Sequence, residues 1–272
     1  MKSIVPDIST PELLETVINI AAAAATEILA VYATEFTSND KEDKSPLTAA
    51  DMASHKLICR KLAELTPDTP ILSEESASIP YSTRKAWRQY WLVDPLDGTR
   101  EFIKRNGEFT INIALIEQHR PVLGVVQVPV KDICYYAAEK LGAYKRGPDV
   151  TTKLKVKRTA AGKYKVAGSR SHGSEKQTRF IQKLGDNAEL ISIGSSLKFC
   201  LVAEGLVDVY PRFGPTSEWD TAAAQCIVEQ AGGMVIDINF KPLRYNTKES
   251  LLNPEFLVIA DRNFNWQPFL PH

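Results

Sequence analysis

The stretch Trp91–Phe102 has the sequence WLVDPLDGTREF, in which an apolar run is followed directly by a turn with two acids. Its apolar start, Trp91–Val93, is typical of the end of a buried strand, and two acids, Asp94 and Asp97, follow in a turn with a proline and a glycine. Carboxylates clustered at a strand end repel one another and gain nothing from packing. The stretch therefore predicts a site for something positively charged.

The composition limits the classes of protein that fit. The chain has 272 residues, 44% of them hydrophobic, and 33 basic side chains balance 33 acidic ones. This length can bury one large core or two packed lobes. A formal net charge of zero argues against binding to a nucleic acid polymer, which usually requires a basic excess. The four cysteines lie far apart without CxxC spacing, which favours free thiols over disulfides.

The N-terminal part predicts two helices and no targeting segment. The opening MKSIVPDIST lacks a basic region followed by an apolar core, so we expect no signal peptide. The first helix should start with Ser9 as its N-cap and run to about Phe36, and Glu27 and other polar residues in it favour a buried helix over a membrane span. The segment 37–46 predicts a mobile loop. The second helix should open at Thr48–Asp51, with Asp51 in its first turn.

Strand and helix signals then divide the chain into two lobes. Residues 109–140 have the alternation of an antiparallel meander, and beyond a basic, polar segment at 142–157 strands alternate with helices. We therefore expect an α+β fold in two lobes, an N-terminal lobe over residues 1–150 and a C-terminal lobe over residues 151–272. A helix opening near Asp220 belongs to the second lobe.

Acids stand at element ends in four segments. Glu74 and Glu75 follow one strand, Asp94 and Asp97 follow another, and Asp51 and Asp220 fall in predicted first turns of helices. Each has an ordinary structural explanation, since first-turn acids complement the helix dipole and the DPLDG sequence favours a turn. Together they indicate a hard divalent cation, which takes carboxylate and carbonyl oxygens as ligands.

The DPLDGT turn has the parts of a metal-assisted phosphatase. A pair of ions needs a bridging carboxylate, which Asp94 or Asp97 can supply, with the Leu96 carbonyl between them. Gly98 lets the backbone approach an anion, and Thr99 adds a hydroxyl that can orient water. A rival phosphatase chemistry uses an aspartate nucleophile in a DxDGT pattern. Here the two acids are one residue too far apart for it, which favours direct attack by water.

The acidic segments resemble the inositol monophosphatase superfamily of magnesium-dependent, lithium-sensitive phosphatases. The matching pieces are Ser73–Ser76, Asp94–Thr99 and Trp219–Ala223, in the same order. The segments 101–115, 194–205 and 210–223 resemble the bacterial bisphosphate nucleotidase branch in particular. The resemblance covers nearly the whole chain and implies the layered α/β/α/β sandwich of the sugar-phosphatase type.

The resemblance also implies roles for the acids. Glu74, Asp94 and the Leu96 carbonyl would bind one Mg²⁺, and Asp94, Asp97 and Asp220 would bind a second. Asp51 and Thr99 would position or deprotonate the attacking water. Glu74, Gly98, Thr99 and Asp220 would also lie against the substrate, and Glu75 would stand behind the ligands.

The nucleotide end of the site is expected in the second lobe. The segment Ser169–His172 resembles one that contacts the nucleotide in related enzymes, which makes Ser171 and His172 candidate substrate contacts. Gly194 and Lys198 match a glycine and lysine pair there, and Lys198 is a plausible point charge for the phosphate that is not cleaved. An ordinary surface histidine and a helix-opening lysine are equally open readings.

The implied activity is removal of the 3′-phosphate of 3′-phosphoadenosine 5′-phosphate by water at a two-metal centre, with 3′-phosphoadenylyl sulfate as a second substrate. Two alternatives stay open: the same chemistry on inositol phosphate or another sugar phosphate, and a nonhydrolytic nucleotide-binding module. We expect a small-molecule partner, no nucleic acid polymer, no integral membrane segment, and a monomer or homodimer. The expected location is the cytoplasm, with attachment to the cytoplasmic face of the inner membrane left open.

Overall fold

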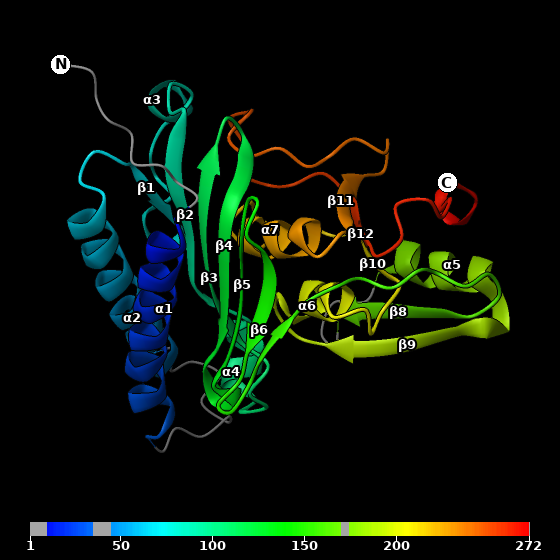
Figure 1. Cartoon of the computed structure of the whole chain (residues 1–272), viewed down its shortest axis with the longest axis horizontal. Helices are drawn as coiled ribbons and strands as arrows, with labels where there is room; N and C mark the ends of the chain where they lie inside the picture. Colours follow the sequence, from blue (N-terminus) through cyan, green and yellow to red (C-terminus); the bar gives the residue numbers. More distant parts are fainter. Residues whose placement is uncertain (1–9, 35–44, 170–173, 272) are drawn as a thin grey trace.

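A computed structural model describes residues 10–34, 45–169 and 174–271, and these form two β-sheets with helices packed on and between them (Figure 1). The first sheet and its helices comprise α1 (Pro11–Tyr32), α2 (Ser45–Leu65), β1 (Ile71–Ser73), α3 (Tyr81–Arg84), β2 (Gln89–Asp97), α4 (Thr99–Ile103), β3 (Thr110–Glu117), β4 (Arg120–Val128), β5 (Ile133–Ala138), β6 (Gly142–Arg146) and β7 (Thr151–Lys153). The second part comprises β8 (Tyr164–Ser169), α5 (Glu175–Leu184), β9 (Ala188–Ile193), α6 (Leu197–Ala203), β10 (Val209–Arg212), α7 (Ala222–Gln230), β11 (Met234–Asp237) and β12 (Phe256–Ile259). Short 3-10 turns lie at Glu74–Ser76, Pro129–Lys131, Gly185–Asn187 and Gln267–Phe269.

The first sheet has seven strands in chain order, β1 to β7, with β1 parallel to β2 and every later pair antiparallel. The predicted meander is therefore confirmed in β3, β4 and β5. The second sheet has the order β11-β12-β10-β8-β9 and mixes parallel and antiparallel pairs. The break between the sheets lies between Lys153 and Tyr164, while the division into lobes at residue 150 stays a prediction.

Alternating residues of the strands face different layers. On β2, Trp91 and Val93 pack with α1 and α2, whereas Tyr90 and Leu92 pack with the helices between the sheets. Residues of α6 and α7, such as Phe199 and Ile227, fill that middle layer together with one face of the second sheet. The layered α/β/α/β fold is thus confirmed, and α5 with the C-terminal segment covers the outer face of the second sheet (Figure 1).

Helix α1 is buried against the first sheet and α2. By length and hydropathy it is the one helix among the described residues able to cross a membrane. However, Val17, Ala21, Ala24 and Ile28 are each 0% exposed in the protein core. Their burial accounts for the apolar composition of α1 without a lipid surface.

The predicted helix boundaries needed correction. Thr10 rather than Ser9 is the N-cap of α1, because its hydroxyl accepts from the Leu13 amide. The helix ends at Tyr32, short of Phe36, since Thr34 binds the Val31 carbonyl through both its amide and its hydroxyl. Helix α2 begins at Ser45 rather than at Thr48, which places Asp51 beyond its first turn. Most of the predicted loop at 37–46 lies outside the described residues.

Candidate active site

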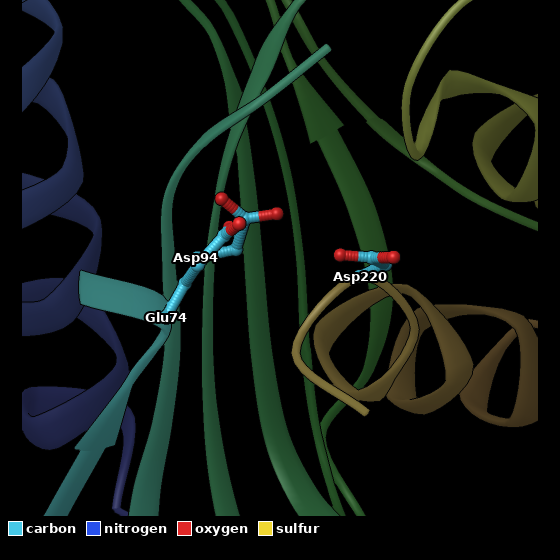
Figure 2. A group of neighbouring side chains, drawn as sticks. All are labelled: Glu74, Asp94 and Asp220. Carbon is cyan, nitrogen blue, oxygen red and sulfur yellow. The ribbon is translucent and has the colours of Figure 1, made fainter. Parts of the chain in front are cut away.

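Three carboxylates from three separate segments converge between the sheets. Glu74 follows β1, Asp94 lies in β2, and Asp220 lies just before α7. One carboxylate oxygen from each lies within 4.8 Å of the others. Figure 2 shows Glu74 and Asp94 together at the strand ends, with Asp220 facing them from the start of α7. Because the ligands of a hard cation must surround one point, this group fits a divalent metal ion.

The parallel pairing of β1 and β2 brings the first two acids together. Ser73 pairs with Val93, so Glu74, which follows β1, lies beside Asp94, the next residue of β2. The 3-10 turn that begins at Glu74 ends β1 at this point. Neighbouring parallel strands lie only about 4.8 Å apart. A sheet pairing, rather than contact along the chain, therefore places these carboxylates next to each other.

A bulge explains why Asp94 and Asp97 are three residues apart. Asp94 pairs with Asn112 and Asp97 with Thr110, so three steps along β2 match two along β3. In a regular strand, residues three apart point to opposite faces, but the extra residue of a bulge returns the second one to the first one's side. The Leu96 amide donates to Asp94 Oδ1 over 3.0 Å and fixes this turn. The three-residue spacing thus places both acids on one side of the sheet.

Ser196 connects Asp97 with Asp220. Its hydroxyl lies 3.0 Å from Asp97 Oδ2 and 2.8 Å from the Asp220 carbonyl oxygen, and it accepts from the Asn112 amide group over 3.0 Å. Thr110 contributes a longer hydrogen bond to Asp97 Oδ2, at 3.4 Å. Neither Ser196 nor Asn112 was singled out from the sequence. The second serine of GSSLK gives no signal of its own in the sequence, because its partners Asp97 and Asp220 lie far away along the chain.

Asp220 is held by its own loop and by a buried polar network. The Ser217 amide donates to Asp220 Oδ2 over 2.9 Å. Two residues before Asp220, Glu218 Oε2 accepts from the Asn246 amide over 2.8 Å, and the Arg84 guanidinium donates to the Asn246 side chain. Arg84, Glu218 and Asn246 are each at most 2% exposed. Asp220 itself precedes α7, whose first residue is Ala222, so the prediction that it lies in the first helical turn was wrong.

Burial and mutual repulsion disfavour the ionised forms of these carboxyl groups. Burial, together with the nearby carboxylates of Glu75 and Glu74, raises the pKa of Asp51 to about 8. Burial and the neighbouring Asp97 raise the pKa of Asp220 to about 8 and that of Glu74 to about 6. Burial, with the surrounding carboxylates, also holds the pKa of Asp94 well above its ordinary range. Such clustering is costly unless positive charge compensates it.

Two further observations support a cation at this position. Asp51 Oδ1 is buried without a hydrogen-bond partner among the described residues, so it has an acceptor to offer to a ligand. The donors are all oxygens, the set that Mg²⁺ prefers over softer metals. The residues present therefore fit the divalent ion that the sequence implied. Asp94 belongs to both of the ligand sets expected from the sequence.

A cavity of about 230 Å³ opens beside the acids, and residues from both parts of the chain line it. Its walls include Asp97, Gly98, Thr99, Arg100, Glu101, Ser169, Gly194, Ser195, Ser196, Lys198, Phe199, Tyr210, Arg212, Thr216 and Asp220. Gly98 has a φ of +95° and packs against Phe109, where an added Cβ would meet the Phe109 Cα at 3.2 Å. A side chain at Gly98 would therefore crowd the backbone of Phe109 and strain the left-handed conformation of this turn.

The predicted nucleotide contacts differ in their surroundings. Gly194 lines the cavity, but its amide donates to Glu108 Oε2 over 2.9 Å, which engages this donor within the protein. Lys198 is 7% exposed and its ammonium group donates to the Ser195 carbonyl. Burial lowers the pKa of Lys198 to about 8. Ser171 and His172 lie outside the described residues.

Arg212 is a cavity residue that the sequence reasoning missed. Its Nε donates to the Thr216 hydroxyl over 2.7 Å, and a terminal nitrogen donates to the Pro215 carbonyl over 2.8 Å. Together with Arg100 it adds cationic side chains to the wall that holds Lys198. Arg212 belongs to the segment YPRFGPTSEWD, but nothing in its position along the sequence distinguishes it from an ordinary surface arginine.

The fold is that of the phosphatase class that the motifs resemble. The sequence pattern described as the inositol monophosphatase family matches residues 10–266, and the chain belongs to that family. The chain is 52% identical over 248 residues to the 3′(2′),5′-bisphosphate nucleotidase CysQ of Salmonella typhimurium. This match covers 90% of this chain and 99% of that protein. It is 48% identical over 248 residues to the protein of the same name from Escherichia coli K12, with 90% and 99% covered.

A solved structure agrees with this assignment. The crystal structure of CysQ from Bacteroides thetaiotaomicron, described as a bacterial member of the inositol monophosphatase family, superimposes with a TM-score of 0.85. It shares 42% sequence identity, and the match covers 94% of this chain and 100% of that one. The family and the fold class expected from the motifs are therefore confirmed.

Proposed function

We propose that this protein is a magnesium-dependent phosphatase that converts 3′-phosphoadenosine 5′-phosphate to AMP and phosphate, with 3′-phosphoadenylyl sulfate as a second substrate. The observation that carries the proposal is the carboxylate group of Glu74, Asp94 and Asp220 in a chain 52% identical to a bisphosphate nucleotidase. The hydrolytic reading is favoured over a binding module because a site that only binds a nucleotide has no need to bury this many acids.

Two ions are proposed, with Glu74, Asp94 and the Leu96 carbonyl at one, and Asp94, Asp97 and Asp220 at the other. Bound divalent ions would neutralise phosphate charge and lower the pKa of water. Asp94 would serve both ions, and the bulge that turns Asp94 and Asp97 to one side of the sheet supports this assignment.

The remaining roles belong to the residues around the acids. Asp51 would accept the proton of the attacking water, because its buried Oδ1 has no hydrogen-bond partner among the described residues and is left as an acceptor. Thr99 would orient that water, and Gly98 would allow the phosphate close to the backbone. The cations of Lys198 and Arg212 on the cavity wall would hold the 5′-phosphate of a bisphosphate substrate.

The experiment that tests the proposal measures phosphate release from 3′-phosphoadenosine 5′-phosphate and from inositol 1-phosphate side by side. Each substrate is assayed with Mg²⁺, with a chelator, and with Mg²⁺ plus lithium. We expect a strong preference for the nucleotide, no activity with the chelator, and inhibition by lithium. Preference for inositol 1-phosphate would move the proposal to the sugar-phosphate alternative. No activity on either substrate would favour the nucleotide-binding module. A cytoplasmic location and a monomeric or homodimeric state stay predictions.

A further inference from the structure

A second cavity, of about 410 Å³, lies where the last strands of the first sheet meet the end of α6. Among the described residues it shares no lining residue with the cavity beside the acids. Its walls come from the turn after β4, from β5, from the β6–β7 hairpin and from Glu204, the C-cap of α6. Residues from four separate elements therefore enclose a space for which the proposed phosphatase reaction has no use.

The wall of this cavity is strongly basic. Four lysines, Lys131, Lys145, Lys153 and Lys155, line it against a single carboxylate, Glu204. The chain as a whole has a formal net charge of zero, so this concentration of positive charge is local. Like charges placed around one cavity repel one another, and an anionic ligand would relieve that repulsion.

Glu204 cannot neutralise the group, because its two oxygens are already engaged. Lys145 Nζ lies 2.7 Å from Glu204 Oε2, and the Tyr135 hydroxyl donates to Glu204 Oε1 over 2.7 Å. Within the described part of the chain, Lys131, Lys153 and Lys155 form no ion pair. Three cationic side chains are thus left to meet a ligand.

The cavity also offers apolar contacts. Ile133 and Leu154 belong to its lining, and Leu154 is only 5% exposed. At the rim, Val150 is 64% exposed, which is high for a branched apolar side chain. Pockets that bind small organic molecules combine an apolar lining with a few polar groups that fix orientation. An inorganic ion would not need the apolar part.

We propose that this cavity is a binding site for a small organic anion, one with a phosphate or carboxylate group on a flat apolar body. Lys131, Lys153 and Lys155 would contact the anionic group, and Val150, Ile133 and Leu154 would contact the body. The site is separate from the proposed active site and goes beyond the phosphatase reaction.

Pyridoxal 5′-phosphate is a suitable probe, because it joins a phosphate to a flat ring and carries an aldehyde. A lysine amine adds to the aldehyde with loss of water to form an imine, and borohydride then supplies the hydride that reduces it to a stable secondary amine. The full-length protein is treated in the presence of a chelator, so that the probe is not hydrolysed. Peptide mass mapping then locates each labelled lysine.

We expect at least one of Lys131, Lys153 and Lys155 to be labelled at about tenfold lower probe concentration than Lys61 and Lys165, whose side chains are each 47% exposed. Pyridoxal, which lacks the phosphate, should lose this preference. Phenyl phosphate should protect the cavity lysines and leave the reference lysines unprotected. The double variant Lys153→Gln, Lys155→Gln should lower labelling of Lys131 about tenfold, whereas Lys61→Gln should not change it.

Three results would overturn the proposal. If the labelling of each lysine followed only the exposed fraction of its side chain, the cavity lysines would not form a joint site. If pyridoxal labelled the cavity lysines as well as pyridoxal 5′-phosphate does, the phosphate group would have no role in binding. Protection by vesicles of phosphatidylglycerol, with none by phenyl phosphate or by phosphatidylcholine vesicles, would assign the cluster to a lipid surface instead. Thermal unfolding of the glutamine variants, with Tm unchanged, controls for loss of fold.

Discussion

Gly124 of β4 lies directly against Ala223 in the first turn of α7. A Cβ added to Gly124 would lie 2.2 Å from the Ala223 carbonyl oxygen, well inside any allowed contact. The close approach seats α7 on the first sheet, and Asp220, three residues before Ala223, is thereby brought to the acids at the end of β2. A glycine with no functional atom of its own thus controls the distance between the two parts of the metal group.

Gly124→Ala should therefore affect both stability and activity. The methyl group forces α7 away from the sheet, and overpacking of this kind costs about 1–3 kcal/mol in the free energy of unfolding. Because α7 carries Asp220 with it, the apparent affinity for Mg²⁺ should fall as well. Chemical denaturation and the Mg²⁺ dependence of phosphate release measure the two effects. Gly147→Ala is the control, since its nearest contact would be at 3.9 Å and its stability should change by less than about 0.5 kcal/mol.

Asp94→Asn should abolish most of the activity without unfolding the protein. Asp94 is 1% exposed among other acids, and the neutral amide relieves their repulsion, so the protein with chelator should be no less stable than the parent. Activity should fall by orders of magnitude, and the rise in Tm on adding Mg²⁺ should be lost. Asp186→Asn, at an exposed position, should alter neither property. Normal turnover with unchanged Mg²⁺ affinity would disprove the role of Asp94 as a metal ligand.

Stability should fall less steeply with pH when a cation is bound than when the site holds none. The pKa values of Asp51 and Asp220, each about 8, lie above the ordinary 3.8, so the folded protein without a cation holds protons that the unfolded chain releases. Its free energy of unfolding should therefore fall as pH rises from about 4 to about 8. Mg²⁺ binds the ionised carboxylates and should offset this loss more strongly at higher pH.

The measurement is Tm at several pH values between 5 and 9, in chelator and in Mg²⁺. The Asp220→Asn variant is the control. It lacks one of the two carboxyl groups with a raised pKa, so its Tm in chelator should fall less steeply with pH. A chelator curve that stays level or rises with pH would contradict the proposed origin of the pKa shifts.

Arg84→Lys should weaken metal binding from a distance. The Arg84 guanidinium binds the Asn246 side chain and the Glu249 carbonyl, and the Asn246 amide in turn holds Glu218, two residues before Asp220. A lysine cannot bridge two acceptors in the same plane. Because Glu218 lies two residues before Asp220, loss of this support should shift the Asp220 loop and lower the affinity for Mg²⁺ several-fold. Maximal activity at saturating Mg²⁺ should change much less.

The matched control for Arg84 is Arg262→Lys. Arg262 also binds a backbone carbonyl, that of Gly233, but beyond the opposite end of α7. It should lower Tm without a change in Mg²⁺ affinity. Equal losses of Mg²⁺ affinity in both variants would show that Arg84 acts through general stability rather than through Asp220.

Lys198→Ala tests whether this buried lysine binds a second phosphate or only supports the Ser195 carbonyl. If its ammonium group also serves a second phosphate, KM should rise far more for the bisphosphate than for a simple monophosphate, with kcat less affected. Lys165→Ala, at an exposed position, should leave both KM values unchanged. Equal effects on the two substrates would assign Lys198 to the support of the Ser195 carbonyl alone.

Part of this protein follows from the sequence alone. Glu74–Glu75 and Asp94–Asp97 were identifiable because carboxylates at strand ends have no packing reason to be there, and Asp220 was identifiable because Trp219–Ala223 resembles a motif of the family. The alternating patterns of β3 to β5 identified the meander, since their period follows from the local geometry of a strand. These features depend on neighbours in the chain, which a sequence displays directly.

Tertiary structure decided the rest. The bulge of β2 against β3, the pairing of Ser73 with Val93, and the contact of Gly124 with Ala223 each join residues far apart along the chain. Ser196 and Arg84 acquire their contacts only through such pairings, and only the tertiary structure brings Arg212 to the same cavity wall as Lys198, so no local pattern marks them. The basic cavity depends on both sequence and tertiary structure: Lys145, Lys153 and Lys155 lie in the basic segment 142–157 that the sequence displays, but only the tertiary structure brings Lys131 and Glu204 to them.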